Sequence, residues 1–156
     1  LMMVFVPIAA AMAVTRNRPE LARLTRRLLT AVSLAGVLLA AICIPLAAPI
    51  VTTVWGEDYR SSADVFAILA LSTVPLFIGL ACLNLAGALH REKDCLGILI
   101  VTALANAAMN AVVIPAYGAP GAAWTTFATE CLAATALLVL ILRAIRSGQT
   151  TEAGDG

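Results

Sequence analysis

The chain alternates long apolar runs with short polar segments, and the lengths of these runs predict its elements. A helix needs about 20 apolar residues to cross roughly 30 Å of hydrocarbon. Four runs reach that length, and they cover residues 28–54, 65–89, 96–115 and 120–142. These runs do not show the regular apolar–polar alternation of transmembrane β-strands. The sequence therefore predicts an all-α fold, a polytopic membrane bundle with four full transmembrane helices.

A shorter apolar run opens the chain over residues 1–14, and it is too short to span a bilayer. Basic residues follow this run, whereas a signal peptide carries them in front. We therefore expect residues 1–14 to be the truncated end of a fifth helix, with further N-terminal helices of the same protein before it. Residues 144–156 are polar and rich in glycine, which predicts a disordered tail.

Prolines and glycines suggest where these helices bend. Pro45 and Pro49 lie in the outer half of the run over residues 28–54, so they predict a kink within one continuous helix. The segment after Pro115 has turn composition, and it predicts an antiparallel hairpin about Gly118 between the last two runs.

The basic residues lie on alternate loops, in the positive-inside pattern of membrane proteins. They are Arg16, Arg18, Arg23, Arg26 and Arg27 before the first full run, Arg91 and Lys93 before the third, and Arg143 and Arg146 after the last. Arg60 is the one basic residue on the other side. This pattern predicts a cytoplasmic C-terminus. Trp55, Tyr59 and Tyr117 fall at the opposite ends of the runs, where an interfacial aromatic belt is expected.

Composition excludes several classes of function. Hydrophobic residues make up 62% of the chain and charged residues 12%, against about 25% charged in soluble domains. This excludes a soluble enzyme, and the net charge of +1 offers no field that would attract nucleic acid. The four cysteines form no C-x-x-C pair and there is one histidine, His90, so we expect no metal site and no cofactor.

A few polar side chains interrupt the last two runs. Glu130 lies near the middle of its run, while Asn106 and Asn110 share one helix face in the run before it. In a hairpin about Gly118, Asn106 and Glu130 would lie at one depth. Asn110 and Thr126 would lie at another.

Two interpretations of these residues stay open. The asparagines can act as interhelical hydrogen bonds of roughly 0.6 kcal/mol each, with Glu130 neutral and bonded to them. Alternatively, Glu130, Asn106, Asn110 and Thr126 line an aqueous path that binds a proton, an ion or a polar substrate, since an ionised group at this depth costs roughly 2.5–3.5 kcal/mol.

The basic cluster before the first full run also has two interpretations. Arg16, Arg18, Arg23, Arg26 and Arg27 can contact anionic lipid headgroups or a lipid diphosphate. The simpler interpretation is that they only set the topology.

Four stretches together resemble a known family. They are FVPIAAAMAV before the basic loop, WGEDYRSSADVFAILALS, LNLAGALHREK and the hairpin NAAMNAVVIPAYGAPGAA. Their order and spacing are similar to the C-terminal half of polysaccharide-biosynthesis flippases of the multidrug/oligosaccharidyl-lipid/polysaccharide exporter superfamily, over about residues 1–143. The motifs are a Gly56–Tyr59 turn, a Gly87–Lys93 turn and an Asn106–Ala122 hairpin.

The resemblance implies a twelve-helix protein of the bacterial cytoplasmic membrane, built from two six-helix lobes around a central cavity. Such a protein flips a lipid-linked oligosaccharide by alternating access. The chain would cover the end of helix eight through helix twelve, and so hold only a remnant of the helices that line the cavity. Glu130 would lie in the last helix, which is peripheral.

Three other functions stay open, and one of them is an inert or regulatory membrane module that does not transport by itself. A cation-coupled drug exporter of the same superfamily would share the fold. A membrane-embedded glycosyl- or acyltransferase subunit would need catalytic groups, and the candidates are His90, Glu92 and Asp94, without a nucleophile beside them. We therefore expect a transporter rather than an enzyme.

Overall fold

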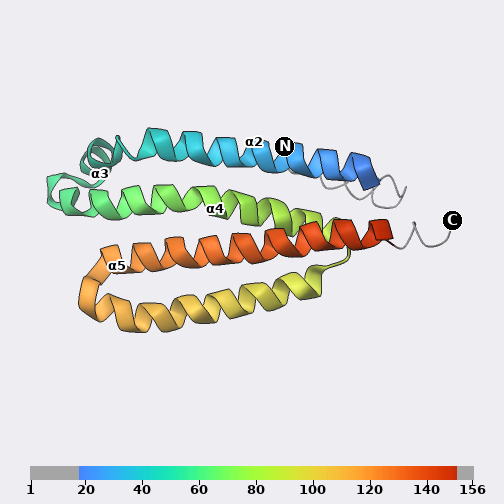
Figure 1. The fold of residues 1–156 in the computed structure, drawn as a ribbon. Helices are drawn as coiled ribbons and strands as arrows, with labels where there is room; N and C mark the ends of the chain where they lie inside the picture. Colours follow the sequence, from blue (N-terminus) through green and yellow to red (C-terminus); the bar gives the residue numbers. More distant parts are fainter. Residues whose placement is uncertain (1–17, 151–156) are drawn as a thin grey trace.

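The computed structural model describes residues 18–150, and side-chain environments within them for residues 22–145. Its elements are α2 (Arg18–Cys43), α3 (Ala47–Trp55), the 3-10 helix η1 (Glu57–Ser62), α4 (Ala63–Ala88) and α5 (Glu92–Thr150), as Figure 1 shows. No strand occurs within residues 18–150, so the predicted all-α class is confirmed for this part of the chain. The predicted partial helix over residues 1–14 lies outside the described residues.

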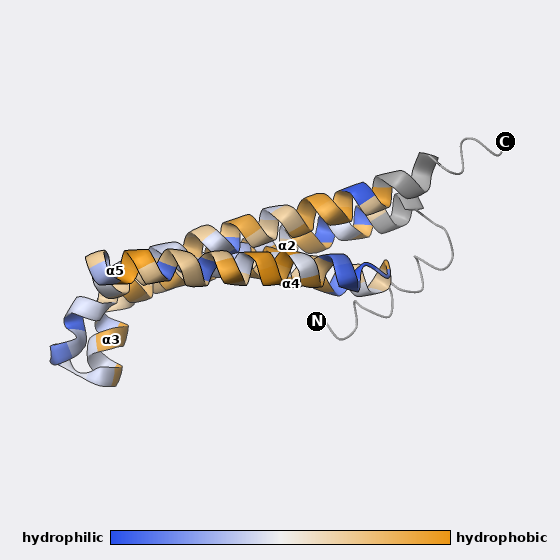
Figure 2. Cartoon of the chain, turned by 90° about the horizontal axis from the view of Figure 1, so that it is seen from below, coloured by the Kyte–Doolittle hydropathy of each residue, from blue (hydrophilic) through white to orange (hydrophobic). Residues whose placement is uncertain are grey.

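Three helical segments are long and apolar enough to cross a membrane. They are Ala22–Cys43, Glu57–Ala88 and Glu92–Ile145. Figure 2 shows apolar residues along α4 and α5, while polar residues gather mainly toward the two ends of the bundle. The chain therefore has the character of a multi-pass membrane protein.

The longest helix, α5, is bent at one glycine. Gly118 has φ 62° and ψ −147°, which is not a helical conformation and which glycine adopts at little cost. The chain reverses there, so α5 consists of a first limb (residues 92–117) and a second limb (residues 119–150) that lie antiparallel (Figure 1). The hairpin predicted about Gly118 is confirmed.

The bend is tight because Gly121 has no side chain. A Cβ atom at this position would lie 2.6 Å from Val113 Cγ1 and 2.7 Å from Tyr117 Cβ. Non-bonded carbon atoms do not approach so closely. The second limb can therefore pack against the first limb directly after the turn only because residue 121 is glycine. The glycines of the PAYGAPGAA segment thus have structural roles.

The prediction of one kinked helix over residues 28–54 is wrong. Helix α2 ends at Cys43 and a separate helix, α3, begins at Ala47 and turns across the end of the bundle (Figures 1 and 2). Pro45 lacks an amide hydrogen and disfavours helical backbone in the residue before it, so the helix stops instead of bending. Pro49 lies in the first turn of α3, where no intrahelical partner for its amide is needed.

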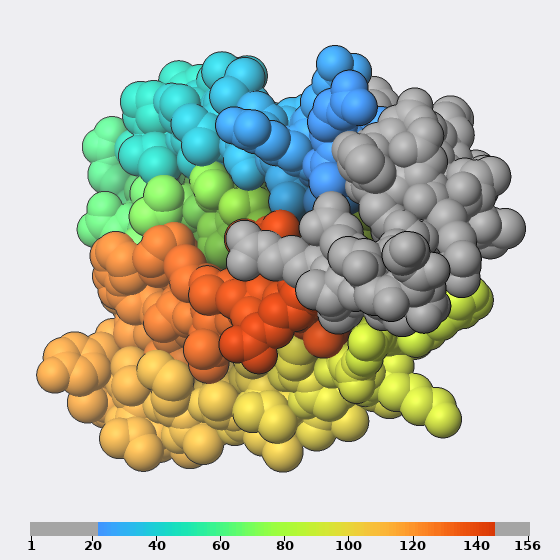
Figure 3. Space-filling view, turned by 45° about the vertical axis from the view of Figure 1, so that its right-hand side comes forward, coloured from blue at the N-terminus to red at the C-terminus, as the bar shows by residue number. Residues whose placement is uncertain are grey.

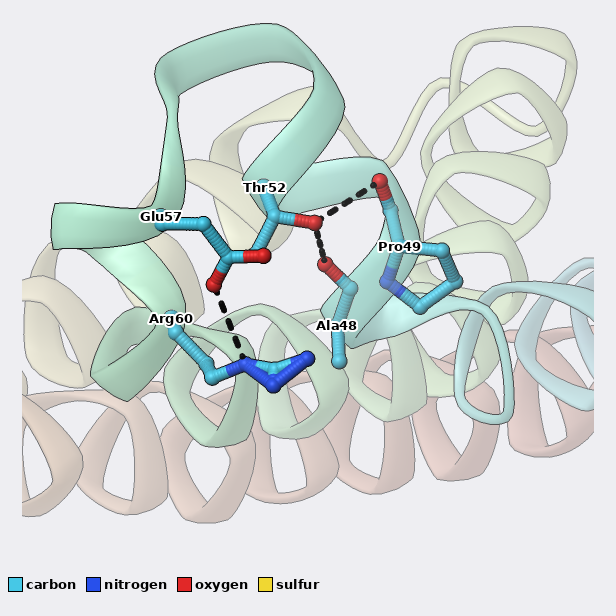
Figure 4. A network of polar contacts seen from close by, with 5 residues as sticks. All are labelled: Ala48, Pro49, Thr52, Glu57 and Arg60. Atoms are coloured by element: carbon cyan, nitrogen blue, oxygen red, sulfur yellow. Dashed lines mark hydrogen bonds and ion pairs between the residues drawn. The ribbon is translucent and has the colours of Figure 1, made fainter.

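The end of the bundle formed by α3 and η1 carries its own polar contacts, which Figure 4 shows from close by. Thr52 Oγ1 donates a hydrogen bond to the carbonyl oxygen of Ala48 at 3.0 Å. Arg60 Nε lies 3.3 Å from Glu57 Oε2, and both side chains are largely exposed. Such a surface ion pair is worth roughly 0–1 kcal/mol. This end is therefore held mainly by a small apolar cluster of Ala47, Val51 and Ala63, which joins α3 to α4.

Helix α4 is the centre of the bundle, with α2 on one side and the second limb of α5 on the other (Figure 1). The core cluster joins all three elements and includes Leu28, Ala81, Cys82, Leu85, Ala86, Leu137 and Ile141. Small residues let the helices approach: a Cβ atom on Gly36 of α2 would lie 3.0 Å from the Cα atom of Val74.

The predicted disordered tail begins too early at residue 144. Helix α5 continues to Thr150, and Ile145, 5% exposed, still belongs to the core cluster that contains Leu28. Residues 151–156 lie outside the described residues.

Candidate functional site

A chain of polar side chains joins the two limbs of α5 inside the apolar part of the bundle. Asn106 Nδ2 donates to Thr129 Oγ1 at 2.8 Å, so it links the first limb to the second. Asn110 Nδ2 donates to Asn106 Oδ1 at 2.9 Å. Thr129 Oγ1 in turn donates to the carbonyl oxygen of Thr125 at 2.9 Å. We call this series of hydrogen bonds, from Asn110 through Asn106 and Thr129 to Thr125, the amide chain. Its donors all point from Asn110 toward the second limb.

The amide chain is open at its first member. Asn110 Oδ1 is buried and has no hydrogen-bond partner among the described residues. An unpaired buried acceptor costs about 1–3 kcal/mol, much of which a donor group would recover. A water molecule, a hydroxyl group or a cation can fill this role chemically.

The predicted depths are correct to within one residue, but the predicted partners are not. Asn106 lies twelve residues before Gly118, and its partner Thr129 lies eleven residues after it. No hydrogen bond joins Asn106 to Glu130 among the described residues, because neighbouring positions on a helix point about 100° apart. Thr129 therefore faces the first limb and Glu130 is turned away from it.

The second predicted pair, Asn110 with Thr126, is also not formed in the described part of the chain. Thr126 Oγ1 donates to the carbonyl oxygen of Ala122 at 3.0 Å instead. The residue that sequence reasoning missed is Thr129. Its spacing of four from Thr125, another buried threonine, was the available signal, since such residues share a helix face.

Glu130 is half-buried, and its depth follows from the packing of α4 on the second limb. A Cβ atom on Gly79 would lie 3.9 Å from Leu137 Cδ1, and the two helices run in the same direction (Figure 1). Glu130 comes seven residues before Leu137 and Ser72 seven residues before Gly79, so they lie at similar depths. Ser72 is 5% exposed and donates its hydroxyl to the carbonyl oxygen of Ile68.

Thr102 lies one turn before Asn106 but does not extend the amide chain. Its hydroxyl donates to carbonyl oxygens of its own helix, at 3.0 Å to Ile98 and 3.1 Å to Leu99. It is 8% exposed, so it is a buried polar residue of the same limb with a purely local role. This makes Thr102 a matched control for the asparagines.

The basic residues gather at one end of the bundle. Arg23, Arg26 and Arg27 are exposed in the first turns of α2, Arg18 begins that helix, and Arg16 lies outside the described residues. The connection from α4 to α5 and the last turns of α5 lie at the same end (Figure 1). Trp55, Tyr59 and Tyr117 belong to segments at the opposite end, and all three are more than half exposed.

The basic end also carries the histidine. His90 is exposed in the turn between α4 and α5, with a φ of 54°. Beside it, Arg91 Nη1 and Asp94 Oδ2 form an ion pair of 3.1 Å. Within the described residues, no group of three His, Cys, Asp or Glu side chains could hold a metal ion.

We compared the chain with known protein families, curated proteins and solved structures. No family model, no curated protein and no solved structure matches the chain.

Proposed function

We propose that this chain is part of a transporter that flips lipid-linked oligosaccharide or polysaccharide precursors across a bacterial cytoplasmic membrane by alternating access. The observation that carries the proposal is the amide chain inside the apolar bundle, with its unpaired acceptor at Asn110. Polar groups at this depth commonly mark the path of a polar substrate. The resemblance of four stretches to polysaccharide flippases supplies the class of substrate. The proposal adds residues of the last two spans to a path that the resemblance by itself assigns mainly to other helices of the protein.

The chemistry of the amide chain suits a saccharide. Sugar hydroxyl groups are donors, and the Asn110 carbonyl oxygen is an acceptor without a partner among the described residues. The side chains of the amide chain are neutral, so each hydrogen bond to a substrate contributes a modest binding free energy. Modest binding is what a transported molecule requires, because it has to leave the site as well as enter it.

The architecture is compatible with half of a two-lobed transporter. Counting each limb of α5 as one crossing gives four full spans, and the basic end of the bundle then lies in the cytoplasm with the C-terminus. The first limb exposes large apolar residues, among them Val101, Leu104 and Val112. That face is available to lipid or to further helices of the same protein.

The decisive experiment replaces the open acceptor. In the intact protein, Asn110→Leu should lower export of the lipid-linked precursor about tenfold, because a substrate hydroxyl loses its acceptor during passage. Thr102→Val is the matched control and should leave export unchanged. Export is measured as surface polysaccharide and as precursor left in the inner leaflet, and the melting temperature of each variant reports on folding.

Equal export by the Asn110 variant and the wild type would contradict the proposal. Deletion of the gene separates the other functions: arrested precursor synthesis would indicate a transferase, and lost drug resistance with normal polysaccharide a drug exporter. Glu130→Gln tests the carboxyl group by itself. Unchanged, pH-independent transport would exclude Glu130 from the path and leave the asparagines as its remaining candidates.

A further inference from the structure

A groove lies between α2 and the second limb of α5, and α4 forms the floor of its middle part (Figure 3). Both helices pack on α4, and this leaves two neighbouring hollows between them. One hollow, of about 700 Å³, lies toward the basic end, and the other, of about 440 Å³, lies toward the middle of the bundle. Leu138 lines both, so they form one groove. Volumes of roughly 300–1,000 Å³ are typical of sites for small ligands.

The α2 wall of the groove is a single helical stripe. Its residues recur every three or four positions, which places them on one face, and they include Ala22, Arg26, Leu29, Ser33 and Val37. The opposite wall is almost wholly apolar and includes Phe127, Ala134, Leu138 and Leu142. The groove therefore accepts a long apolar group.

The length of the stripe fits one leaflet of a bilayer. Arg26 and Val37 are eleven residues apart, which is about 16 Å at the helical rise of 1.5 Å per residue. Half of a hydrocarbon core of roughly 30 Å is about 15 Å. With Arg26 at headgroup level, Val37 lies near the bilayer midplane. An acyl chain in this groove would run from the membrane surface to its centre.

The mouth of the groove is complementary to an anion. In the described part of the chain, Arg26 is the one charged residue that lines either hollow. Beside it, Thr25 lines the same hollow, is 2% exposed, and its hydroxyl oxygen has no hydrogen-bond partner among the described residues. Phosphate oxygens accept hydrogen bonds from both a guanidinium and a hydroxyl group. Another apolar helix laid over Arg26 would leave this charge without a partner.

We propose that the groove binds one anionic phospholipid of the cytoplasmic leaflet, with an acyl chain between α2 and α5 and its phosphate on Arg26. The bound lipid fills the part of the seam that the contacts between α2 and the second limb of α5 leave open. This inference does not depend on the transported substrate, since it concerns bulk phospholipid. The experiment below measures bound lipid and not transport. The lipid proposal and the transport proposal can therefore be refuted independently of each other.

The test places the intact protein in nanodiscs of phosphatidylglycerol and phosphatidylcholine, without any polyprenyl lipid. Native mass spectrometry of the released protein counts the retained lipids. We expect one retained phosphatidylglycerol, and Arg26→Gln should lower its occupancy about fivefold. Arg27→Gln is the matched control, because it removes the same charge from a neighbouring residue that does not line the groove. It should change the occupancy less than twofold.

A second variant tests the apolar part. Leu138→Trp fills the groove and should also release the lipid, whereas Leu132→Trp, at an exposed position of the same limb, should not. Equal loss in the Arg26 and Arg27 variants, or equal retention of phosphatidylcholine, would overturn the proposal. So would photo-crosslinking from position 138 to a polypeptide, which would identify another helix or a second copy as the occupant.

Discussion

The two limbs of α5 are both helical and mostly apolar, yet they stand in opposite environments. In the second limb, Leu137 is 1% exposed and Ile141 is fully buried against α4 and α2. In the first limb, Leu104 is 66% exposed and Val112 is 75% exposed. Apolar character therefore does not distinguish a core helix from a peripheral one in this protein. In lipid, burial depends on close packing and hydrogen bonds between helices, because the hydrocarbon around them is equally apolar.

The first limb is held by few contacts. Cys95 joins the core cluster at the basic end, Asn106 reaches Thr129 in the middle, and Gly121 lets the limbs meet near the turn. The second limb is held along most of its length. Substitutions should therefore have unequal effects in the two limbs, and matched pairs of variants measure the difference.

The largest difference is expected between two leucines. Leu137→Ala should lower the free energy of unfolding by about 2–5 kcal/mol, because it leaves a cavity in the packed centre of the bundle. Leu104→Ala removes the same atoms from an exposed position and should cost less than about 0.5 kcal/mol. Unfolding of both variants in mixed detergent micelles provides the measurement. A similar cost at Leu104 would refute the contrast and show that further protein covers the first limb.

An intermediate effect is expected at the turn between the limbs. Gly121→Ala forces a Cβ atom against Val113 and Tyr117, and it should cost about 1–3 kcal/mol. Gly97→Ala is the control in the first limb: nothing lies within 4 Å of its Cβ position, so better helix propensity should stabilise it by up to about 1 kcal/mol. The melting temperatures of the two variants, compared with that of the wild type, provide the measurement. Equal stability would mean that the limbs part easily at the turn.

The smallest effect is expected for the hydrogen bond between the limbs. Asn106→Ala should destabilise by about 0.6 kcal/mol, and at most about 1.7 kcal/mol, as is usual for interhelical hydrogen bonds in membranes. A double-mutant cycle with Thr129→Val isolates the bond between these two residues. Asn106→Ala paired with Thr102→Val should show no coupling, since Thr102 bonds its own helix. Coupling in the second cycle alone would contradict the observed partners.

Much of the fold could be predicted from local signals. Run lengths indicated the helices, and Gly118 indicated the reversal because few other residues adopt its backbone conformation. The proline segment was harder: Pro45 permits either a kink or a stop, and the choice depends on whether neighbouring helices satisfy the freed carbonyl groups. Here the chain stops at Cys43 and turns into α3.

The polar site was predictable in depth but not in pairing. Counting residues from Gly118 placed Asn106 opposite positions 129 and 130, because antiparallel helices of equal rise keep the same depth. Choosing between Thr129 and Glu130 requires the rotation of one helix about its axis. That rotation is set by the contacts of the second limb with α4, in which Leu137 and Ile141 are buried.

The sequence by itself determined that the chain is helical, that its runs suit a bilayer, that its basic residues gather at one end and that it reverses at Gly118. These properties follow from length, composition and single-residue conformation, all of which are local. Only the tertiary structure decided which limb of α5 enters the core, that Thr129 completes the amide chain, and that a groove remains between α2 and the second limb. The reason is that the direction in which a side chain points depends on how its helix is rotated and packed. An apolar stripe has the same sequence whether protein or lipid covers it.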